Sequence, residues 1–224
     1  MDPTSSSGNT YYIVVDGYGG QSGSYQLRIF RDEISNVVVF ENNEPNTTLL
    51  KNFTVTNGYA GGSSENNSGG GIRLSNSASP TLNNLIVTDN YAQGSGGGIF
   101  IEGGSSPIIN YCNVIGNTSN EEGGGIFAKG SNNNDEKVTL YGCEVSGNTA
   151  NRGGGFFSRE IAVQIDESTF QNNITNYNDG GGLFVESAHP FEFSNSEASY
   201  NQGSGFYINH GGDHKIKNIV AIHN

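Results

Sequence analysis

The sequence of 224 residues contains no tryptophan, one methionine, two cysteines and few basic side chains. Ten lysines and arginines against 22 aspartates and glutamates give a formal net charge of −12. Nucleic acid and anionic membrane surfaces do not attract so acidic a surface, and we therefore expect neither as a partner. The charge balance is typical of a solvated extracellular surface, with at most weakly bound calcium and no other cofactor.

Long apolar segments are also absent. No apolar run approaches the roughly 20 residues that a membrane-spanning helix requires, so we expect no membrane insertion within this fragment. Met1 is followed by Asp2-Pro3-Thr4-Ser5 rather than by a basic stretch and an apolar segment, which excludes a signal peptide there. Because the composition is still that of an exported protein, we expect an extracellular or cell-surface fragment whose export signal and anchor lie elsewhere.

Glycine, by contrast, is abundant, with 34 residues, and much of it falls into triplets that begin at residues 69, 96, 123, 153 and 180. Most neighbouring triplets are 27 residues apart, and a degenerate Gly203-Ser204-Gly205 follows. A fixed period of this size indicates a solenoid, in which each unit buries its apolar face only against its neighbours.

Further columns of residues repeat with the same period as the triplets. The residue after each triplet is apolar: Ile72, Ile99, Ile126, Phe156, Leu183 and Phe206. A second apolar column contains Leu50, Leu82, Ile109, Leu140, Ile165, Phe193 and Ile216. Five residues later stand Val55, Val87, Val114, Val145, Phe170, Ala198 and Ala221, and eight residues later stand Gly58 and then Asn90, Asn117, Asn148, Asn173, Asn201 and Asn224.

These columns predict an all-β parallel β-helix of about six to seven coils with three short strands per coil. In such a fold each strand pairs in parallel with the equivalent strand of the next coil, about 4.8 Å away, so like residues stack on like. A slip of one residue would turn an apolar column outward. We expect the asparagines to form a ladder that satisfies buried backbone groups at a turn.

The repeats resemble those of chlamydial polymorphic outer-membrane proteins and related bacterial right-handed β-helix proteins. The glycine-triplet strands and the turn Phe170-Gln171-Asn172-Asn173 carry this resemblance, which covers residues 34–224. It implies a right-handed helix in a secreted or surface-exposed, often adhesive protein. Residues 1–33, with Tyr11–Gly20 and Gly23–Ile29 as two strands, resemble the last hairpin of a bacterial pre-peptidase C-terminal domain. The chain would then combine a remnant of a β-rich domain with a β-helix truncated at its C-terminus.

An aromatic column alternates with the first apolar column. Strand alternation places its members on the opposite face of the sheet: Phe100, Phe127, Phe157, Phe184 and Tyr207. If the aliphatic column faces the core, the rings form an outward ladder that suits sugar rings or an extended partner chain, with polar contacts from a rim of Glu102, Lys129, Arg159 and Glu186. Two other interpretations remain open. In one, the rings stack on one another only to fix the register; in the other, another domain covers them.

Catalytic and metal-binding residues are harder to find. Inverting glycoside hydrolysis needs two carboxylates about 6.5–9.5 Å apart, whereas the acids here lie mostly in turns and the cations are scattered. The cluster His210–His214 reads as a polar turn or a metal site, and the loop Asn132–Glu136 as a solvated loop or a weak calcium site. Cys112 and Cys143 share a column in adjacent coils, where stacked thiols are favoured over a disulfide.

The sequence therefore favours a secreted or surface-displayed structural and adhesive β-helix. It would bind carbohydrate or a surface protein of a host or neighbouring cell along its glycine-triplet strands. The alternative is a polysaccharide lyase or glycoside hydrolase of the kind built on β-helices, or a non-catalytic part of one.

Overall fold

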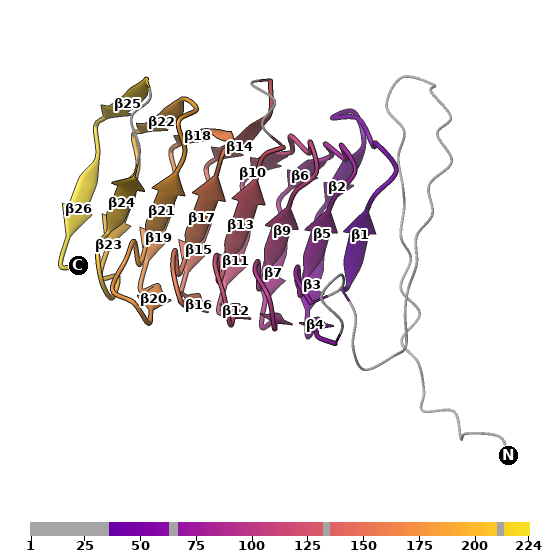
Figure 1. Cartoon of the computed structure of the whole chain (residues 1–224), viewed down its shortest axis with the longest axis horizontal. Coiled ribbons are helices and arrows are strands. Elements are labelled where there is room, and N and C mark those ends of the chain that lie inside the picture. The colour runs from indigo at the N-terminus through magenta and orange to yellow at the C-terminus, as the bar shows by residue number, and fades with distance from the viewer. Residues whose placement is uncertain (1–35, 63–66, 132–134, 210–212) are drawn as a thin grey trace, which may run out of the picture.

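The computed structural model describes residues 36–62, 67–131, 135–209 and 213–224. The expected hairpin remnant of residues 1–33 lies outside these ranges, as do His210 and the first three residues of the loop Asn132–Glu136. The described chain is a parallel β-solenoid whose coils stack side by side along one axis (Figure 1).

Four parallel sheets run along the stack. The β1 sheet consists of β1 (Val38–Phe40), β5 (Ile72–Leu74), β9 (Ile99–Ile101), β13 (Ile126–Lys129), β17 (Phe156–Arg159), β21 (Leu183–Glu186) and β24 (Phe206–Asn209). The β2 sheet consists of β2 (Leu49–Lys51), β6 (Thr81–Asn83), β10 (Ile108–Asn110), β14 (Lys137–Tyr141), β18 (Ala162–Asp166), β22 (Phe191–Ser194) and β25 (His214–Lys217). The β3 sheet consists of β3 (Thr54–Thr56), β7 (Ile86–Thr88), β11 (Asn113–Ile115), β15 (Glu144–Ser146), β19 (Thr169–Gln171), β23 (Glu197–Ser199) and β26 (Val220–Ile222).

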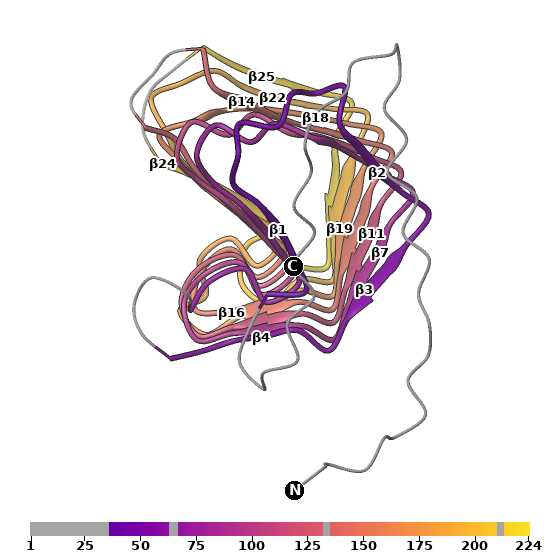
Figure 2. The same cartoon turned by 90° about the vertical axis from the view of Figure 1, so that its right-hand side faces the viewer.

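The fourth sheet was not expected. It is formed by two-residue strands, namely β4 (Tyr59–Ala60), β8 (Tyr91–Ala92), β12 (Thr118–Ser119), β16 (Thr149–Ala150) and β20 (Ile174–Thr175). Five turns therefore contribute to all four sheets, and the prediction of three strands per coil and six to seven coils needs this correction. Viewed along the stack, the first three sheets outline the main body, and a smaller curled lobe that includes β4 and β16 lies beside it (Figure 2).

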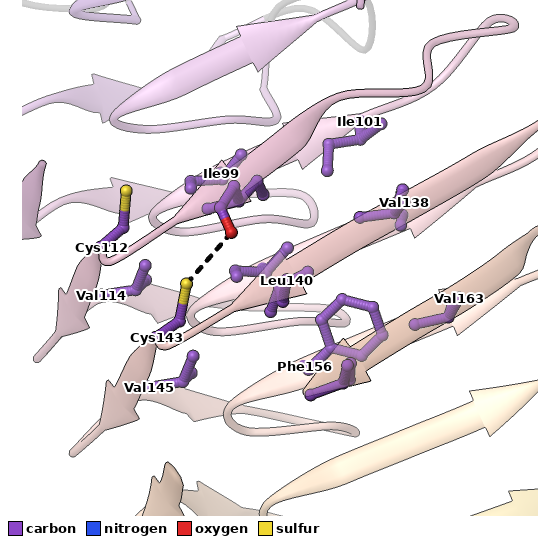
Figure 3. Close-up of a cluster of buried hydrophobic side chains, with 14 of the residues drawn as sticks. Ile99, Ile101, Cys112, Val114, Val138, Leu140, Cys143, Val145, Phe156 and Val163 are labelled. Carbon is purple, nitrogen blue, oxygen red and sulfur yellow. Dashed lines mark hydrogen bonds between the residues drawn. The ribbon is translucent and has the colours of Figure 1, made fainter. Parts of the chain in front are cut away.

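The predicted register is confirmed throughout the three long sheets. Ile126 pairs with Ile99 and Phe156, Leu140 pairs with Ile109 and Ile165, and Val145 pairs with Val114 and Phe170. These columns form one continuous buried core inside the main body, part of which is drawn in Figure 3. Because every coil offers the same apolar positions, each layer of this core rests on an equivalent layer.

The two cysteines belong to this core and are not bonded to each other. The Cys143 thiol donates to the carbonyl oxygen of Ile109 at 3.3 Å (Figure 3). Cys112 approaches the Leu82 carbonyl oxygen at 3.6 Å. Burial raises the pKa of Cys112 to about 12 and that of Cys143 to about 11. Both therefore pack as small, protonated side chains, as the sequence favoured.

The asparagine column forms the predicted ladder. The Asn148 side chain donates to Asn173 Oδ1 at 3.0 Å and to the Val114 carbonyl oxygen at 2.8 Å. Its own Oδ1 accepts from the backbone N–H of Asn117 at 2.9 Å and from Asn117 Nδ2 at 3.0 Å. The same contacts recur along Asn90, Asn117, Asn148, Asn173, Asn201 and Asn224. Each amide thus satisfies two backbone groups of the preceding coil and donates to the amide of the next coil, which links three successive coils.

Candidate binding surface on the outer face of the β1 sheet

The aromatic column stacks as predicted but is not an open surface. Ring centroids of successive members lie 5.1, 5.6, 5.0 and 4.8 Å apart from Phe100 to Tyr207. Phe100, Phe127, Phe157 and Phe184 form a second small core and are 7%, 4%, 0% and 3% exposed, whereas Tyr207 is 40% exposed. The expectation of a five-ring exposed ladder is therefore corrected, because only Tyr207 offers a ligand a large part of its ring.

Part of the cover over the rings comes from the glycine triplets. The first glycine of each triplet has a positive φ, for example 67° at Gly96 and 56° at Gly153. A Cβ atom at Gly96 would lie 2.8 Å from Phe100 Cβ, and one at Gly153 would lie 2.8 Å from Phe157 Cβ. The chain therefore turns directly over the aromatic column, and only glycine allows both the backbone conformation and the close approach.

Arginine side chains complete the cover. The guanidinium carbon of Arg73 lies 5.9 Å from the Phe100 ring centroid, and that of Arg159 lies 5.2 Å from the Phe157 centroid. Arg152 lies 5.9 Å from the Phe184 centroid and 6.0 Å from that of Tyr177. A cation over a ring face is attracted by the negative potential of that face. Within the described chain these are all the arginines, so this residue type is concentrated on one face.

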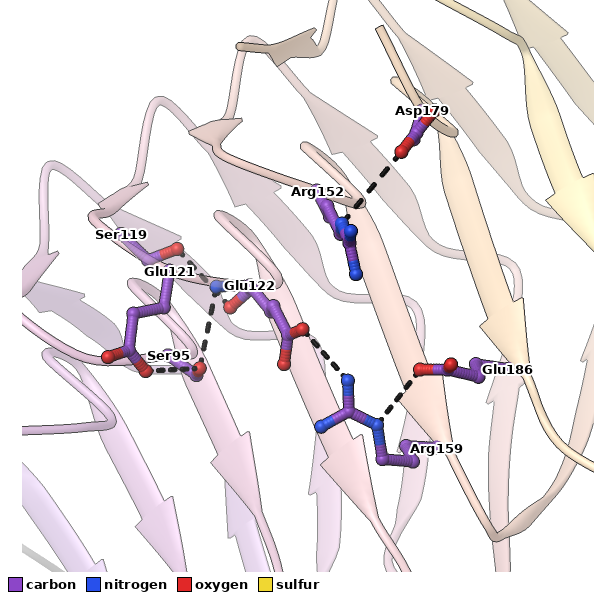
Figure 4. Close-up of polar contacts among 8 residues, drawn as sticks. All are labelled: Ser95, Ser119, Glu121, Glu122, Arg152, Arg159, Asp179 and Glu186. Carbon is purple, nitrogen blue, oxygen red and sulfur yellow. Dashed lines mark hydrogen bonds and ion pairs between the residues drawn. The ribbon is translucent and has the colours of Figure 1, made fainter. Parts of the chain in front are cut away.

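Two charged columns flank the aromatic column, and ion pairs connect them. One column directly precedes the triplets and contains Glu122, Arg152 and Asp179; the other ends the β1-sheet strands and contains Glu102, Lys129, Arg159 and Glu186. Arg159 donates from its terminal nitrogen to Glu122 at 2.9 Å and from Nε to Glu186 at 3.0 Å (Figure 4). We call these side chains, together with Arg73 and the exposed Tyr177 and Tyr207, the charged face.

Burial and ion pairing shift the pKa of Arg159 in opposite directions. Partial burial disfavours its charge, but the hydrogen bond to Glu186 and the charge of Glu122 outweigh this effect, so the pKa of Arg159 lies above its ordinary value. The other two described arginines also lie beside an acid, Arg73 beside Glu102 at 3.2 Å and Arg152, more loosely, beside Asp179 at 3.8 Å. The charged face thus contains four cations, namely Arg73, Lys129, Arg152 and Arg159, in a chain whose formal net charge is −12. Its four anions are Glu102, Glu122, Asp179 and Glu186, and Glu121 is a neighbouring fifth.

The predicted rim is placed along one edge of this face. Glu102, Arg159 and Glu186 are half-buried and ion-paired, whereas Lys129 is exposed and has no acidic partner among the described residues. The sequence did not single out Arg152, Tyr177 or Asp179 as site residues. The charged column before the triplets, read at the same period as the glycines, was the signal that could have identified Arg152 and Asp179.

Among the described residues, the charged face consists mostly of ion-paired side chains rather than of a cluster of metal ligands. Glu122 and Glu186 contact the same guanidinium, that of Arg159, at 2.9 and 3.0 Å. Within the described ranges no group of three or more histidine, cysteine or acidic side chains is arranged to hold a metal ion. No helix in that part of the chain is long and apolar enough to cross a bilayer.

Comparison with known proteins adds no relative to this description. No family model matches the chain, and neither a curated protein nor a solved structure does.

Proposed function

We propose that this chain is a structural and adhesive module of a secreted or surface-displayed protein, and that it binds carbohydrate or a surface protein of another cell through the charged face. The stack of coils would present this face along one side of the solenoid. The resemblance of the repeats to chlamydial polymorphic outer-membrane proteins supports the same role. The proposed site lies along the glycine-triplet strands, and it consists of charged side chains and exposed tyrosines rather than of an aromatic platform.

The concentration of all described arginines on one face is the observation that carries this proposal. These side chains are partly exposed, with side-chain exposure of 18% for Arg73, 33% for Arg159 and 41% for Arg152. Their guanidinium groups are held in place by rings and carboxylates, so little side-chain entropy remains to be lost when a partner binds. Fixed donors beside fixed acceptors form a surface suited to a polar partner.

Adhesion of beads coated with the chain tests the proposal. The beads are applied to arrays of polysaccharides and of cell-surface proteins, and retention under flow is measured for the wild-type chain and a Lys129→Glu/Arg159→Gln variant. We expect the variant to lose the retention of the wild-type chain. A Lys51→Glu variant is the matched control, because Lys51 is exposed on β2, outside the charged face.

Two results would contradict the proposal. Retention that persists in the Lys129→Glu/Arg159→Gln variant would place the adhesive surface elsewhere on the chain. Absence of retention on every array would leave the described solenoid a spacer. Circular dichroism of each variant separates loss of binding from loss of the fold.

A further inference from the structure

We infer that the end of the charged face formed by Arg152, Tyr177, Asp179 and Tyr207 is a subsite for an uncharged sugar unit of a polysaccharide. This inference rests on the proposed function, because it names the ligand class of the same face. The argument depends on where rings become accessible, on how Arg152 is held and on the local balance of charge.

Within the aromatic column, ring surface becomes accessible at this end. The four phenylalanines of the aromatic column are buried, but Tyr207 continues the stack 4.8 Å from Phe184 and is 40% exposed. Tyr177, in the neighbouring lobe, is 61% exposed. Both rings lie close to Phe184 or to the Arg152 side chain beside it, so the two exposed tyrosines belong to one patch. Exposed ring faces of this kind pack well against the C–H faces of a pyranose ring.

Arg152 lies between rings rather than in a close ion pair. Its guanidinium carbon is about equally far from the centroids of Phe184 and Tyr177, at 5.9 and 6.0 Å. Its Nε is buried without a hydrogen bond, and its nearest acidic oxygen, Asp179 Oδ2, is 3.8 Å away. Arg159, by contrast, has carboxylate oxygens at 2.9 and 3.0 Å. The guanidinium of Arg152 is therefore oriented by ring contacts and by a loose ion pair. A hydrogen bond from this guanidinium to a new acceptor, such as a sugar hydroxyl, would stabilise it more than the loose contact with Asp179 that it replaces.

The charges around this patch favour an uncharged ligand. Arg152 and Arg159 are paired with Asp179, Glu186 and Glu122, two cations against three anions, so an acidic sugar gains no net attraction here and meets repulsion from a chain of formal net charge −12. Neighbouring hydroxyl groups of a neutral sugar both donate and accept hydrogen bonds. A guanidinium beside a carboxylate offers both functions within one small area.

The test measures binding of soluble hexasaccharides by calorimetry and by ligand-observed NMR. The probes are cellohexaose, maltohexaose and mannohexaose as neutral chains, and hexagalacturonate as the acidic chain. We expect at least one neutral hexasaccharide to bind and the hexagalacturonate not to bind. Tyr177→Ala and Arg152→Gln should each weaken binding about tenfold, which corresponds to the loss of one ring or charge-assisted contact. Tyr111→Ala removes a comparably exposed ring, 54% exposed, from the turn between β10 and β11 and should leave the affinity unchanged.

Failure of this inference can be distinguished from failure of the proposed function. Binding of hexagalacturonate alone, binding of no neutral probe, or equal affinity in Tyr177→Ala, Arg152→Gln and wild type would each overturn the inference. If the beads still adhere through Lys129 and Arg159 in that case, the proposed function stands and only its ligand class is wrong. Because Tyr177 is an exposed turn residue, its variant is expected to fold, and circular dichroism verifies this.

Discussion

Removing one amide from the middle of the asparagine ladder should destabilise the solenoid far more than removing one at its end. In Asn148→Ala the buried N–H of Asn117 loses its acceptor, and the Val114 carbonyl oxygen loses a donor. The side-chain donor Asn117 Nδ2 also loses its contact with Asn148, but it keeps the Val87 carbonyl oxygen at 2.8 Å. The two backbone groups are therefore the ones that lose a partner without a replacement. At about 1–3 kcal/mol for each buried group left unsatisfied, we expect a loss of about 2–4 kcal/mol in the free energy of unfolding.

Asn224→Ala is the matched control. Asn224 lies in an exposed position and accepts from the backbone N–H of Asn201 at 3.0 Å, and water can replace that contact, so we expect a loss of about 1 kcal/mol or less. Urea unfolding followed by far-ultraviolet circular dichroism gives the free energies. Amide hydrogen exchange should show the Asn117 N–H losing protection in Asn148→Ala. If both variants lose the same free energy and the Asn117 amide stays protected, the ladder is a by-product of stacking and not a cause of it.

Three further predictions concern the columns beside the ladder. Phe157→Ala should destabilise the chain by about 3–5 kcal/mol because its ring is fully buried, whereas Tyr207→Ala, which removes a ring that is 40% exposed, should cost clearly less; urea midpoints measure both. Cys112 and Cys143 should resist alkylation at pH 8 until the chain is unfolded, because burial raises the pKa of their thiols to about 12 and about 11. Since the folded pKa values exceed the unfolded value of 9.0, the contribution of the two thiols to stability should be fully present below pH 9 and be lost as the pH rises toward 11–12. A Cys112→Ala/Cys143→Ala variant that shows the same loss over that range would refute the assignment. Gly98→Ala should lower the melting temperature markedly, because the added Cβ would lie 2.6 Å from a backbone oxygen of the next coil; an unchanged melting temperature would mean that the coils separate readily.

The register could be predicted from the sequence because stacking repeats it in every coil. A residue such as Val145 must face the core between Val114 and Phe170, and any slip would expose all three. The burial of the aromatic column could not be predicted in the same way. It depends on the path of the chain after each asparagine, where the short strand Thr118–Ser119 carries no apolar alternation that would mark it as a strand. The small residues two positions after the ladder asparagines, such as Ala92 and Ala150, were the available signal of a buried lobe.

The partners of the charged side chains were beyond prediction for a different reason. Arg159 reaches Glu122, 37 residues earlier, and Glu186, 27 residues later, and either contact depends on the rotamer of a long side chain. Column spacing places such residues in neighbouring coils but does not specify which atoms meet. The sequence therefore located the face, whereas its ion pairs required the structure.

Stability alone does not account for this face. Ion pairs between partly exposed side chains contribute about 0–1 kcal/mol each, so the pairs of Arg73, Arg152 and Arg159 add little to the stability of the fold. The fold is already stabilised by the asparagine ladder, the buried aromatic column and a continuous core. Outward strand positions that no other part of the chain covers tolerate many residues, since their side chains do not enter a core. On the β3 sheet the equivalent outward positions carry residues as different as Thr54, Ile86 and Asn113. The requirements of the fold therefore do not explain why every described arginine lies beside acids and tyrosines on one face, and this arrangement supports the proposal that the face binds a partner.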